Sequence, residues 1–308
     1  MSGATPASAG TQDAGIAAPD LSAAGLRWDT RGHSTLSGPL LELAAGLDDA
    51  FLSIASRWTA QPEEHPALLA AGDLEPVDYL TSFPHLATFA VCLAPEEDNL
   101  REFVAAQQAS AAGVVRLARL APPMDVLTPA ACYHVYVHHR GEVLSAPRYV
   151  TTRNTCFRRE AFYEPLRRQW SFQMREIVCI GTRDEVAEFL ATARAAADRL
   201  MGELDLPIRW EAATDPFFNP AANPRYLAQR LQPTKHEAVY GDLALASVNL
   251  HEDHFGTAYA ISRAGRAATT GCVAFGIDRW LYALTNRWGT DPADWPDVRA
   301  AAERCGVS

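Results

Sequence analysis

A chain of 308 residues, 48% of them hydrophobic, is long enough to bury the core of one large domain. Its formal net charge is −10 and its basic residues do not cluster, which argues against extended nucleic acid as a partner, because gripping many phosphates requires a basic stripe. The sequence has no run of about eighteen apolar residues and no basic start followed by an apolar segment, so we predict a cytoplasmic protein without a membrane span.

The sequence of the N-terminal half predicts a disordered tail, then a helix and two strands. Residues 1–24 are rich in Ala, Gly, Ser, Thr and Pro, and we expect a disordered tail there. Between residues 40 and 58, apolar side chains recur three and four positions apart, as they do on the buried face of a helix. Segments 83–93 and 126–137 carry β-branched and aromatic residues, which favour strands.

The C-terminal half continues the mixture of helices and strands. Residues 154–182 predict two strands joined by a charged loop, and residues 182–204 predict a helix that Thr182 can cap. Further strands are expected at 235–240, at 243–250, around 257–262 and at the start of 270–288, where a helix follows. The pattern is typical of a single α+β domain over residues 25–308, with a largely antiparallel sheet.

The predicted hairpin carries side chains that are hard to explain by structure alone. A period of two places Arg158 and Glu160 on one face of the first strand, and Phe172 and Glu176 on one face of the second. A lone Arg and Glu would simply form an ion pair on a solvated face. Here Arg168 adds a guanidinium for phosphate, and Phe172 offers a ring on which a purine can stack. The hairpin therefore predicts a nucleotide site, with the acids left for an amine or a metal.

The segment GCVAFGIDR, residues 271–279, supplies a second candidate. Its small residues keep the predicted strand open to close approach, and Arg279 falls in the first turn of the following helix. A helix start that carries an Arg is a natural site for phosphate oxygens, although an exposed Arg on an amphipathic helix explains the pattern equally well.

The six cysteines show no CxxC spacing, so each is expected to be a free thiol or a metal ligand rather than part of a disulfide framework. They are Cys92, Cys132, Cys156, Cys179, Cys272 and Cys305. Two histidines, His138 and His139, precede Arg140 and Gly141 at a predicted strand end, where a solvated turn is favoured over a metal site.

Taken together, the two segments resemble the catalytic core of a class II aminoacyl-tRNA synthetase. CFRRE and the strand up to Glu176 resemble the second motif of that superfamily, and GCVAFGIDR resembles its third. In the third motif, Cys272 and Ala274 stand where glycines are usual. Such a cysteine is similar to those of the atypical seryl-tRNA synthetases of methanogens, where two cysteines and a glutamate hold a Zn²⁺ ion that binds the substrate amino group. The resemblance implies Cys132, Glu176 and Cys272 as the Zn²⁺ ligands; the alternative for the two cysteines is a pair of buried thiols.

The same resemblance implies roles in binding ATP. Arg158 would hold the α-phosphate, and Arg168 and Arg279 would hold the outer phosphates. Phe172 would stack on adenine, and Glu160 would hold the adenine amino group.

The strand before the third motif, in SVNLHEDHFG, lines the ATP and amino-acid pocket in this comparison. His251, Asp253 and His254 look like metal ligands there. The resemblance instead favours Ser247 and Asn249, which would contact the substrate or ATP-bound Mg²⁺. On the preceding strand, Lys235 and Glu237 are further possible pocket residues.

Within the superfamily, the chain resembles the amino acid:carrier protein ligases, truncated homologues of the atypical seryl enzymes. GHSTLSGPLLELAAGLDDAF, SFPHLATFA, PAACYHVY and ASVNLHEDHFG add to the motifs above, so that the resemblance covers roughly residues 30–290. It implies ATP-dependent activation of a small amino acid, glycine or alanine, transfer to the phosphopantetheine thiol of a carrier protein, and a homodimer. No tRNA-binding arm is recognisable; the alternatives are a seryl-type aminoacyl-tRNA synthetase and a non-catalytic regulator that binds an amino acid or nucleotide.

Overall fold

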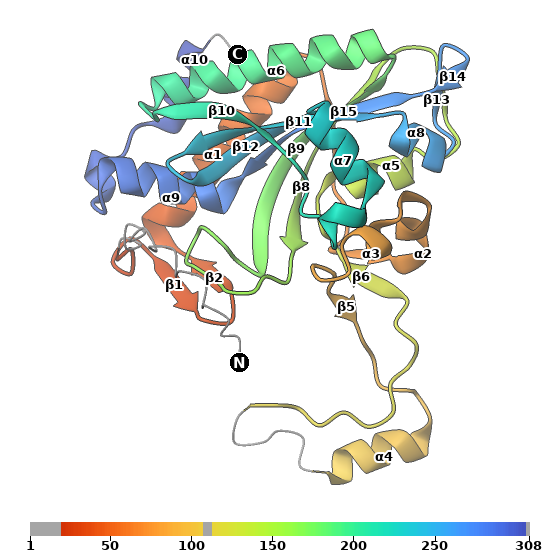
Figure 1. Cartoon of the computed structure of the whole chain (residues 1–308). Coiled ribbons are helices and arrows are strands. Elements are labelled where there is room, and N and C mark those ends of the chain that lie inside the picture. Colours follow the sequence, from red (N-terminus) through yellow and green to blue (C-terminus); the bar gives the residue numbers. More distant parts are fainter. Residues whose placement is uncertain (1–19, 107–112, 306–308) are drawn as a thin grey trace, which may run out of the picture.

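A seven-stranded sheet forms the centre of the protein, for which a computed structural model describes residues 20–106 and 113–305 (Figure 1). The strand order is β10-β11-β12-β15-β9-β8-β3, and all neighbours are antiparallel except β3, which pairs parallel to β8 at the edge. The strands are β3 Gln61–Glu63, β8 Arg148–Phe157, β9 Ser171–Gly181, β10 Ile208–Ala213, β11 Lys235–Tyr240, β12 Leu243–Glu252 and β15 Thr269–Gly276.

Four helices cover one face of this sheet and close the main core. They are α1 Gly38–Ser56, α6 Arg183–Glu203, α9 Ile277–Trp288 and α10 Val298–Arg304. The long helix α6 begins at a complete capping box, in which the side chains of Thr182 and Glu185 each bond to the other residue's backbone amide. Within the described residues, no helix has the length and apolarity needed to cross a membrane.

The other face of the sheet carries short elements and a second apolar cluster, which includes Tyr79, Tyr136, Phe255 and Cys272. The helices here are α2 Ala71–Leu74, α3 Tyr79–Ser82, α5 Cys132–His138, α7 Pro224–Leu231 and α8 His254–Ala258, with 3-10 turns η1 Glu75–Val77, η2 Pro220–Ala222 and, elsewhere, η3 Pro292–Asp294. Small sheets add β1 Leu26–Asp29 with β2 His33–Leu36, and β7 Val143–Leu144 with β13 Ser262–Arg263 and β14 Arg266–Ala267.

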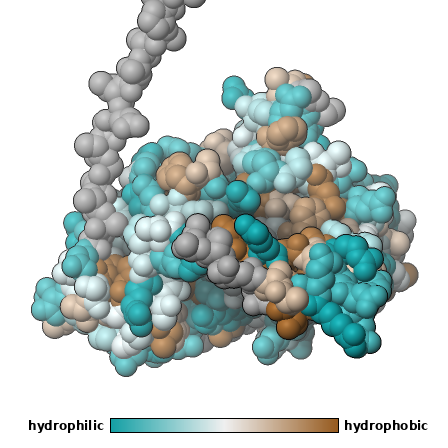
Figure 2. Space-filling view, turned by 90° about the horizontal axis from the view of Figure 1, so that it is seen from below, coloured by the Kyte–Doolittle hydropathy of each residue, from teal (hydrophilic) through white to brown (hydrophobic). Residues whose placement is uncertain are grey.

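An extension leaves the body between β5 and β6 and carries α4, Glu97–Ala105, at its far end (Figure 1). Its base is a three-stranded sheet of β4 Leu68–Ala70, β6 Asp125–Leu127 and β5 Phe89–Ala90. Asn99 holds α4 against the two chain segments that flank it in the extension. Its side-chain amide donates to the carbonyls of Ala94 and Arg119 at 2.7 and 3.0 Å. Figure 2 shows the molecule from below, with apolar patches scattered among polar ones.

The predicted fold class is confirmed, whereas several local predictions are wrong. Residues 132–138 form helix α5 instead of a strand, and most of the stretch around 257–262 belongs to α8 and the turn after it. Of the predicted strand 83–93, only Phe89–Ala90 is a strand. Short apolar runs suit a buried strand and a buried helix equally well, so their sequence cannot distinguish the two.

Three further predictions place residues differently from the structure. Strand β8 ends at Phe157, so Arg158 and Glu160 lie in the loop between β8 and β9 and not on a strand face. His139 follows the end of a helix, and its side chain is only 3% exposed, which contradicts a solvated turn. Of the predicted tail 1–24, residues 1–19 lie outside the described part of the chain, and Leu21 and Ala24 are buried in the core.

Candidate active site

One pocket on the open face of the sheet brings all ten predicted site residues together. Its volume is about 530 Å³, and strands β9, β11, β12 and β15 form its floor. The ten residues that line it are Cys132, Arg158, Glu160, Arg168, Phe172, Glu176, Ser247, Asn249, Cys272 and Arg279.

At one end of the pocket, Cys132, Glu176 and Cys272 converge. One ligand atom from each lies within 4.8 Å of the others, and their exposed fractions are 6%, 1% and 2%. They come from the start of α5, from the middle of β9 and from β15, respectively. Two sulfurs and a carboxylate at this spacing form a donor set that suits Zn²⁺ and leaves a tetrahedral position for a substrate.

The carboxylate of Glu176 is oriented by the start of α5. Its Oε1 accepts hydrogen bonds from the backbone amides of Ala131 and Cys132 at 2.9 and 3.3 Å. The first amides of a helix have no partner within the helix, so they are available for such a bond. The bond to the Cys132 amide links the two candidate ligands directly and fixes the carboxylate against the thiol.

The surroundings at this end disfavour the charged form of both cysteines. The pKa of Cys132 is raised well above its usual value by its hydrogen bond to Cys272, by burial and by the carboxylate of Glu176. The pKa of Cys272 is also raised, because burial and Glu176 outweigh the hydrogen bonds that it receives. A divalent cation is the kind of group that makes two thiolates and a carboxylate stable together in a buried place.

Two further side chains contact the sulfur of Cys272. Nδ2 of Asn249 donates to it at 3.3 Å, and Nε2 of His251 lies 3.8 Å from it. Nδ1 of His251 faces the hydroxyls of Tyr136 and Thr270 at 3.2 Å. Burial lowers the pKa of His251 to about 4, so the ring is neutral near pH 7. Asn249 and His251 therefore both contact the sulfur of Cys272.

At the other end of the pocket lie the arginines. The guanidinium of Arg158 lies over the ring of Phe172, 5.1 Å from its centre, and Nε of Arg158 donates to the carbonyl of Pro129 at 3.0 Å. Arg279 donates to the carbonyls of Arg167 and Ala244 at 3.0 and 3.1 Å. Burial and, next, the charge of Arg158 lower the pKa of Arg279 to about 10. Two cations held close in a buried site create a strong attraction for an anion.

Glu160 and Arg168 form an ion pair of 2.7 Å at this end. Arg168 also lies over the ring of Phe162, with its guanidinium carbon 4.7 Å from the ring centre. Both residues lie in the loop between β8 and β9, which carries them to the pocket wall. In the structure, each of the two side chains is therefore the other's partner.

Lys235 and Glu237 line the pocket as predicted, whereas their neighbour Asp215 was not predicted from the sequence. The ammonium of Lys235 lies 3.1 Å from the carboxylates of both Asp215 and Glu237. Burial would raise the pKa of Asp215, but the charge of Lys235 and a hydrogen bond from Gln229 outweigh it, and the pKa is lowered. Asp215 lies in the loop after β10, where no periodic pattern indicates a buried acid.

Two curated relatives each align with about three quarters of this chain. No family model matches the chain. Amino acid–acyl carrier protein ligase 1 of Bradyrhizobium diazoefficiens is 37% identical over 240 residues, which cover 75% of this chain and 72% of the relative, and ligase 2 of the same organism is 36% identical over a similar span.

More distant relatives are synthetases. The type-2 serine–tRNA ligase of Methanopyrus kandleri is 27% identical over 58% of this chain and 38% of the relative. A crystal structure of M. kandleri SerRS with A. aeolicus tRNASec superposes with a TM-score of 0.74 at 21% identity, over 90% of this chain and 58% of that chain. The catalytic fold of class II aminoacyl-tRNA synthetases is thus present, and the closer sequence identity shows that the chain is an enzyme of the amino acid–acyl carrier protein ligase family.

Proposed function

We propose that this protein uses ATP to activate a small amino acid, glycine or alanine, and then transfers it to the phosphopantetheine thiol of a carrier protein. The observation that carries the proposal is the layout of one pocket, with a metal-type donor set at one end and paired arginines at the other. An amino acid held by its amine at the first end would direct its carboxylate toward phosphates at the second.

At the phosphate end, the chain supplies positive charge. Arg158 would neutralise the α-phosphate, and Arg168 and Arg279 would neutralise the outer phosphates. Adenine would stack on Phe172, whose other partner is the guanidinium of Arg158. The amino group of adenine would be held by Glu160, which must then share or release its ion pair with Arg168.

At the amine end, Cys132, Glu176 and Cys272 would hold Zn²⁺. The bound ion would supply a Lewis acid that takes the neutral amine of an amino acid and excludes molecules without one. Tyr136 and Phe255 pack face to face near these thiols, with ring centres 4.1 Å apart, and Tyr133 meets Phe255 edge to face at 5.5 Å. Such a filled wall supports the proposal of a substrate with little or no side chain.

Mg²⁺ would accompany ATP, as it does in phosphoryl chemistry generally. Ser247 and Asn249 were the predicted contacts. The amide of Asn249 is hydrogen-bonded to Ser247 and Cys272, which places it with the amine end of the pocket. We therefore assign Asn249 to the support of Cys272, and Ser247 stays a candidate for the substrate or Mg²⁺.

The reaction follows in two steps. A carboxylate oxygen of the amino acid attacks the α-phosphorus, the bond to the β-phosphate oxygen breaks, and pyrophosphate leaves. The carrier's thiol then loses its proton to solvent and attacks the carbonyl carbon, the carbon–oxygen bond to the phosphate breaks, and AMP leaves. Both steps depend on positioning and charge neutralisation, so a dedicated general base is not required for the first.

We propose a carrier protein as the acceptor because the chain belongs to the amino acid–acyl carrier protein ligase family. We propose a homodimer because of the resemblance to the class II synthetase superfamily. A seryl-type synthetase that charges tRNA is the second candidate, favoured by the fold alone. Exchange of labelled pyrophosphate into ATP, measured with each amino acid, tests activation. We expect glycine or alanine to support the fastest exchange; no exchange with any amino acid would contradict the proposal.

Transfer is tested separately with labelled amino acid. We expect label on a carrier protein that bears phosphopantetheine and none on the same protein without it. Label on tRNA instead of the carrier would favour the second candidate. Sedimentation of the purified protein would show whether it is a dimer.

A further inference from the structure

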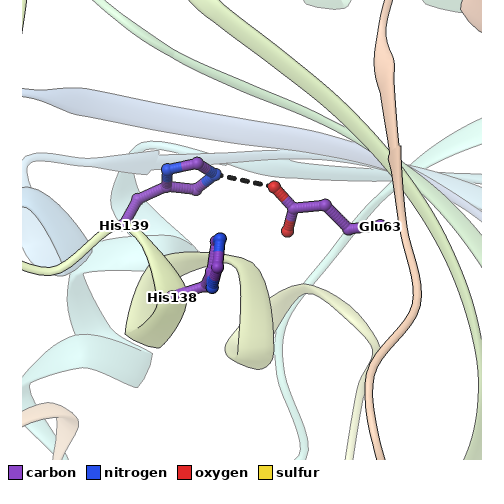
Figure 3. Close-up of side chains that lie close together, drawn as sticks. All are labelled: Glu63, His138 and His139. Atoms are coloured by element: carbon purple, nitrogen blue, oxygen red, sulfur yellow. Dashed lines mark hydrogen bonds and ion pairs between the residues drawn. The ribbon is translucent and has the colours of Figure 1, made fainter.

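A second group of metal-ligating side chains lies outside the pocket, at the opposite end of α5 from Cys132. It consists of Glu63 at the end of β3 and of His138 and His139 at the end of α5 (Figure 3). One ligand atom from each lies within 4.8 Å of the others. Figure 3 shows the three side chains converging on one space, with His139 bonded to Glu63.

The group is built into the fold. Nε2 of His139 lies 2.8 Å from Oε1 of Glu63, and Nδ1 of the same ring lies 2.9 Å from Oε1 of Glu142. The side chains of His139 and Glu63 are only 3% and 15% exposed. A carboxylate on the far nitrogen of an imidazole is the usual outer partner of a metal-bound histidine, because it fixes the ring and its tautomer. Glu142 has that position here.

A fourth donor is His65, which contacts Glu63 but lies outside the group whose ligand atoms are all within 4.8 Å of one another. Its Nε2 lies 3.0 Å from Oε2 of Glu63, and its ring centre lies 6.1 Å from that of His138. The ring of His65 also stacks on that of His134 at 5.1 Å, which restricts its motion. Three imidazoles and one carboxylate form a donor set that suits Zn²⁺ and similar transition ions.

The side chain of His138 is the feature that an ion-pair network does not explain. Among residues 20–106 and 113–305, its imidazole makes no hydrogen bond or ion pair, although its ring is 4.9 Å from that of His139. It is exposed, so an ion can enter from solvent on its side. Zn²⁺ binds nitrogen and oxygen at about 2.0–2.2 Å, which places neighbouring ligands roughly 3.4 Å apart. Small rotations of exposed or half-buried side chains would close the present spacing.

We propose that Glu63, His138 and His139, completed by His65, form a second Zn²⁺ site that fastens the edge strand β3 to the end of α5. Helix α5 is short, about 10 Å long from its rise per residue. Its first residue is Cys132, a candidate ligand of the pocket, so the second site would hold the other end of the element that positions the first. The proposal does not depend on the substrate or the acceptor of the enzyme.

Cobalt titration separates the two sites. The untagged full-length Cys272→Ser protein, stripped with a chelator, would be titrated with Co²⁺, since an oligohistidine tag would bind the same ion. We expect about one bound Co²⁺ per chain with ligand-field absorption but without a thiolate-to-cobalt charge-transfer band, as befits a site of nitrogen and oxygen donors. A Cys272→Ser protein that binds no Co²⁺ would overturn the proposal.

Ligand variants in the same background complete the test. His138→Gln and Glu63→Gln should each weaken Co²⁺ binding at least tenfold, and Glu142→Gln should weaken it by about 10- to 100-fold through loss of the outer partner. His85→Gln changes an exposed histidine elsewhere and should leave binding unchanged. His138 is exposed, so its variant keeps the fold, which circular dichroism verifies. Binding that survives both His138→Gln and Glu63→Gln unaltered would assign the ion to another place and refute the site.

Discussion

Asn249 and Cys272 lie directly opposite each other on neighbouring strands β12 and β15, and the amide of Asn249 donates a hydrogen bond to the cysteine sulfur. Residues in this relation project from the same face of the sheet. The bond stabilises the thiolate form that a metal requires. We expect Asn249→Leu, which keeps the size and removes the donor, to weaken Zn²⁺ binding by about 10- to 100-fold.

Competition with a chromophoric chelator measures that affinity. Asn286→Leu is a suitable control, because Asn286 lies on α9, outside the residues that line the pocket. Equal zinc affinity in the Asn249 variant and the wild-type protein would show that the amide contributes nothing to the site.

The pocket thiols can be distinguished from the other buried cysteines. Cys132→Ser and Cys272→Ser should each remove the thiolate-to-cobalt band and one metal ion per chain, because both sulfurs belong to the candidate donor set. Cys156 lies on β8, outside the residues that line the pocket and outside the cluster of candidate ligands, so we do not expect it to bind the metal. Cys156→Ser should therefore keep the metal and the band. The reverse pattern, with loss in Cys156→Ser alone, would contradict the assignment.

Two adjacent arginines provide a matched pair at the phosphate end. Arg158 lines the pocket, whereas Arg159 is exposed and is not among the residues that line it. Arg158→Ala should slow pyrophosphate exchange by about 100-fold or more, since it removes a charge that faces the reacting phosphate. Arg159→Ala should exchange at nearly the wild-type rate. Similar rates in the two variants would remove Arg158 from the reaction.

Arg279 allows a test by pH. Its pKa is lowered to about 10 by burial and by Arg158, so the wild-type side chain stays charged at neutral pH. A lysine begins from an ordinary pKa of about 10.4, and the same surroundings would lower it further. In Arg279→Lys, the variant side chain should lose its charge as the pH rises, and kcat/KM for ATP should fall at a lower pH than in the wild-type protein. An unchanged alkaline limb would show that the charge at this position is not needed.

A buried ion pair on the other side of the sheet predicts a large stability effect. Asp48 on α1 accepts two bonds of 2.8 Å from Arg175 on β9, and both side chains are close to fully buried. Asp48→Asn leaves the Arg175 charge without its counter-ion and should lower the free energy of unfolding by about 3–5 kcal/mol. Its neighbour Asp49 pairs with Arg299 on the exposed surface. Asp49→Asn should cost at most about 1 kcal/mol. Urea unfolding of both variants compares the two values directly.

The sequence was sufficient to predict a helix or strand where its pattern is carried by neighbouring residues. Helix α6 followed from its cap and its apolar periodicity, and strands β11, β12 and β15 followed from theirs. The ten site residues that the resemblance to class II synthetases implied all line one pocket. These successes share a cause, since each signal is carried by neighbouring residues or by a motif of fixed order.

Other features depend on contacts between distant segments, which no local pattern reveals. Helix α5 was taken for a strand because its apolar run is short, and its helical form is coupled to the amide bonds with Glu176. Asp215 meets Lys235 only because the loop after β10 folds back over the pocket. His139 was placed in solvent, whereas Glu63 from β3 and Glu142 enclose it.

The convergence of Cys132, Glu176 and Cys272 from three remote parts of the chain also constrains the order of folding. Strand β9 lies between β8 and β15, so the carboxylate is in place only when both neighbours have paired and α5 has docked. Closing such long loops costs chain entropy before any ligand meets another. The ion would then arrive at a finished scaffold, unlike in a zinc finger, where the metal drives folding. Metal starvation should therefore yield a compact but inactive protein and not an unfolded one.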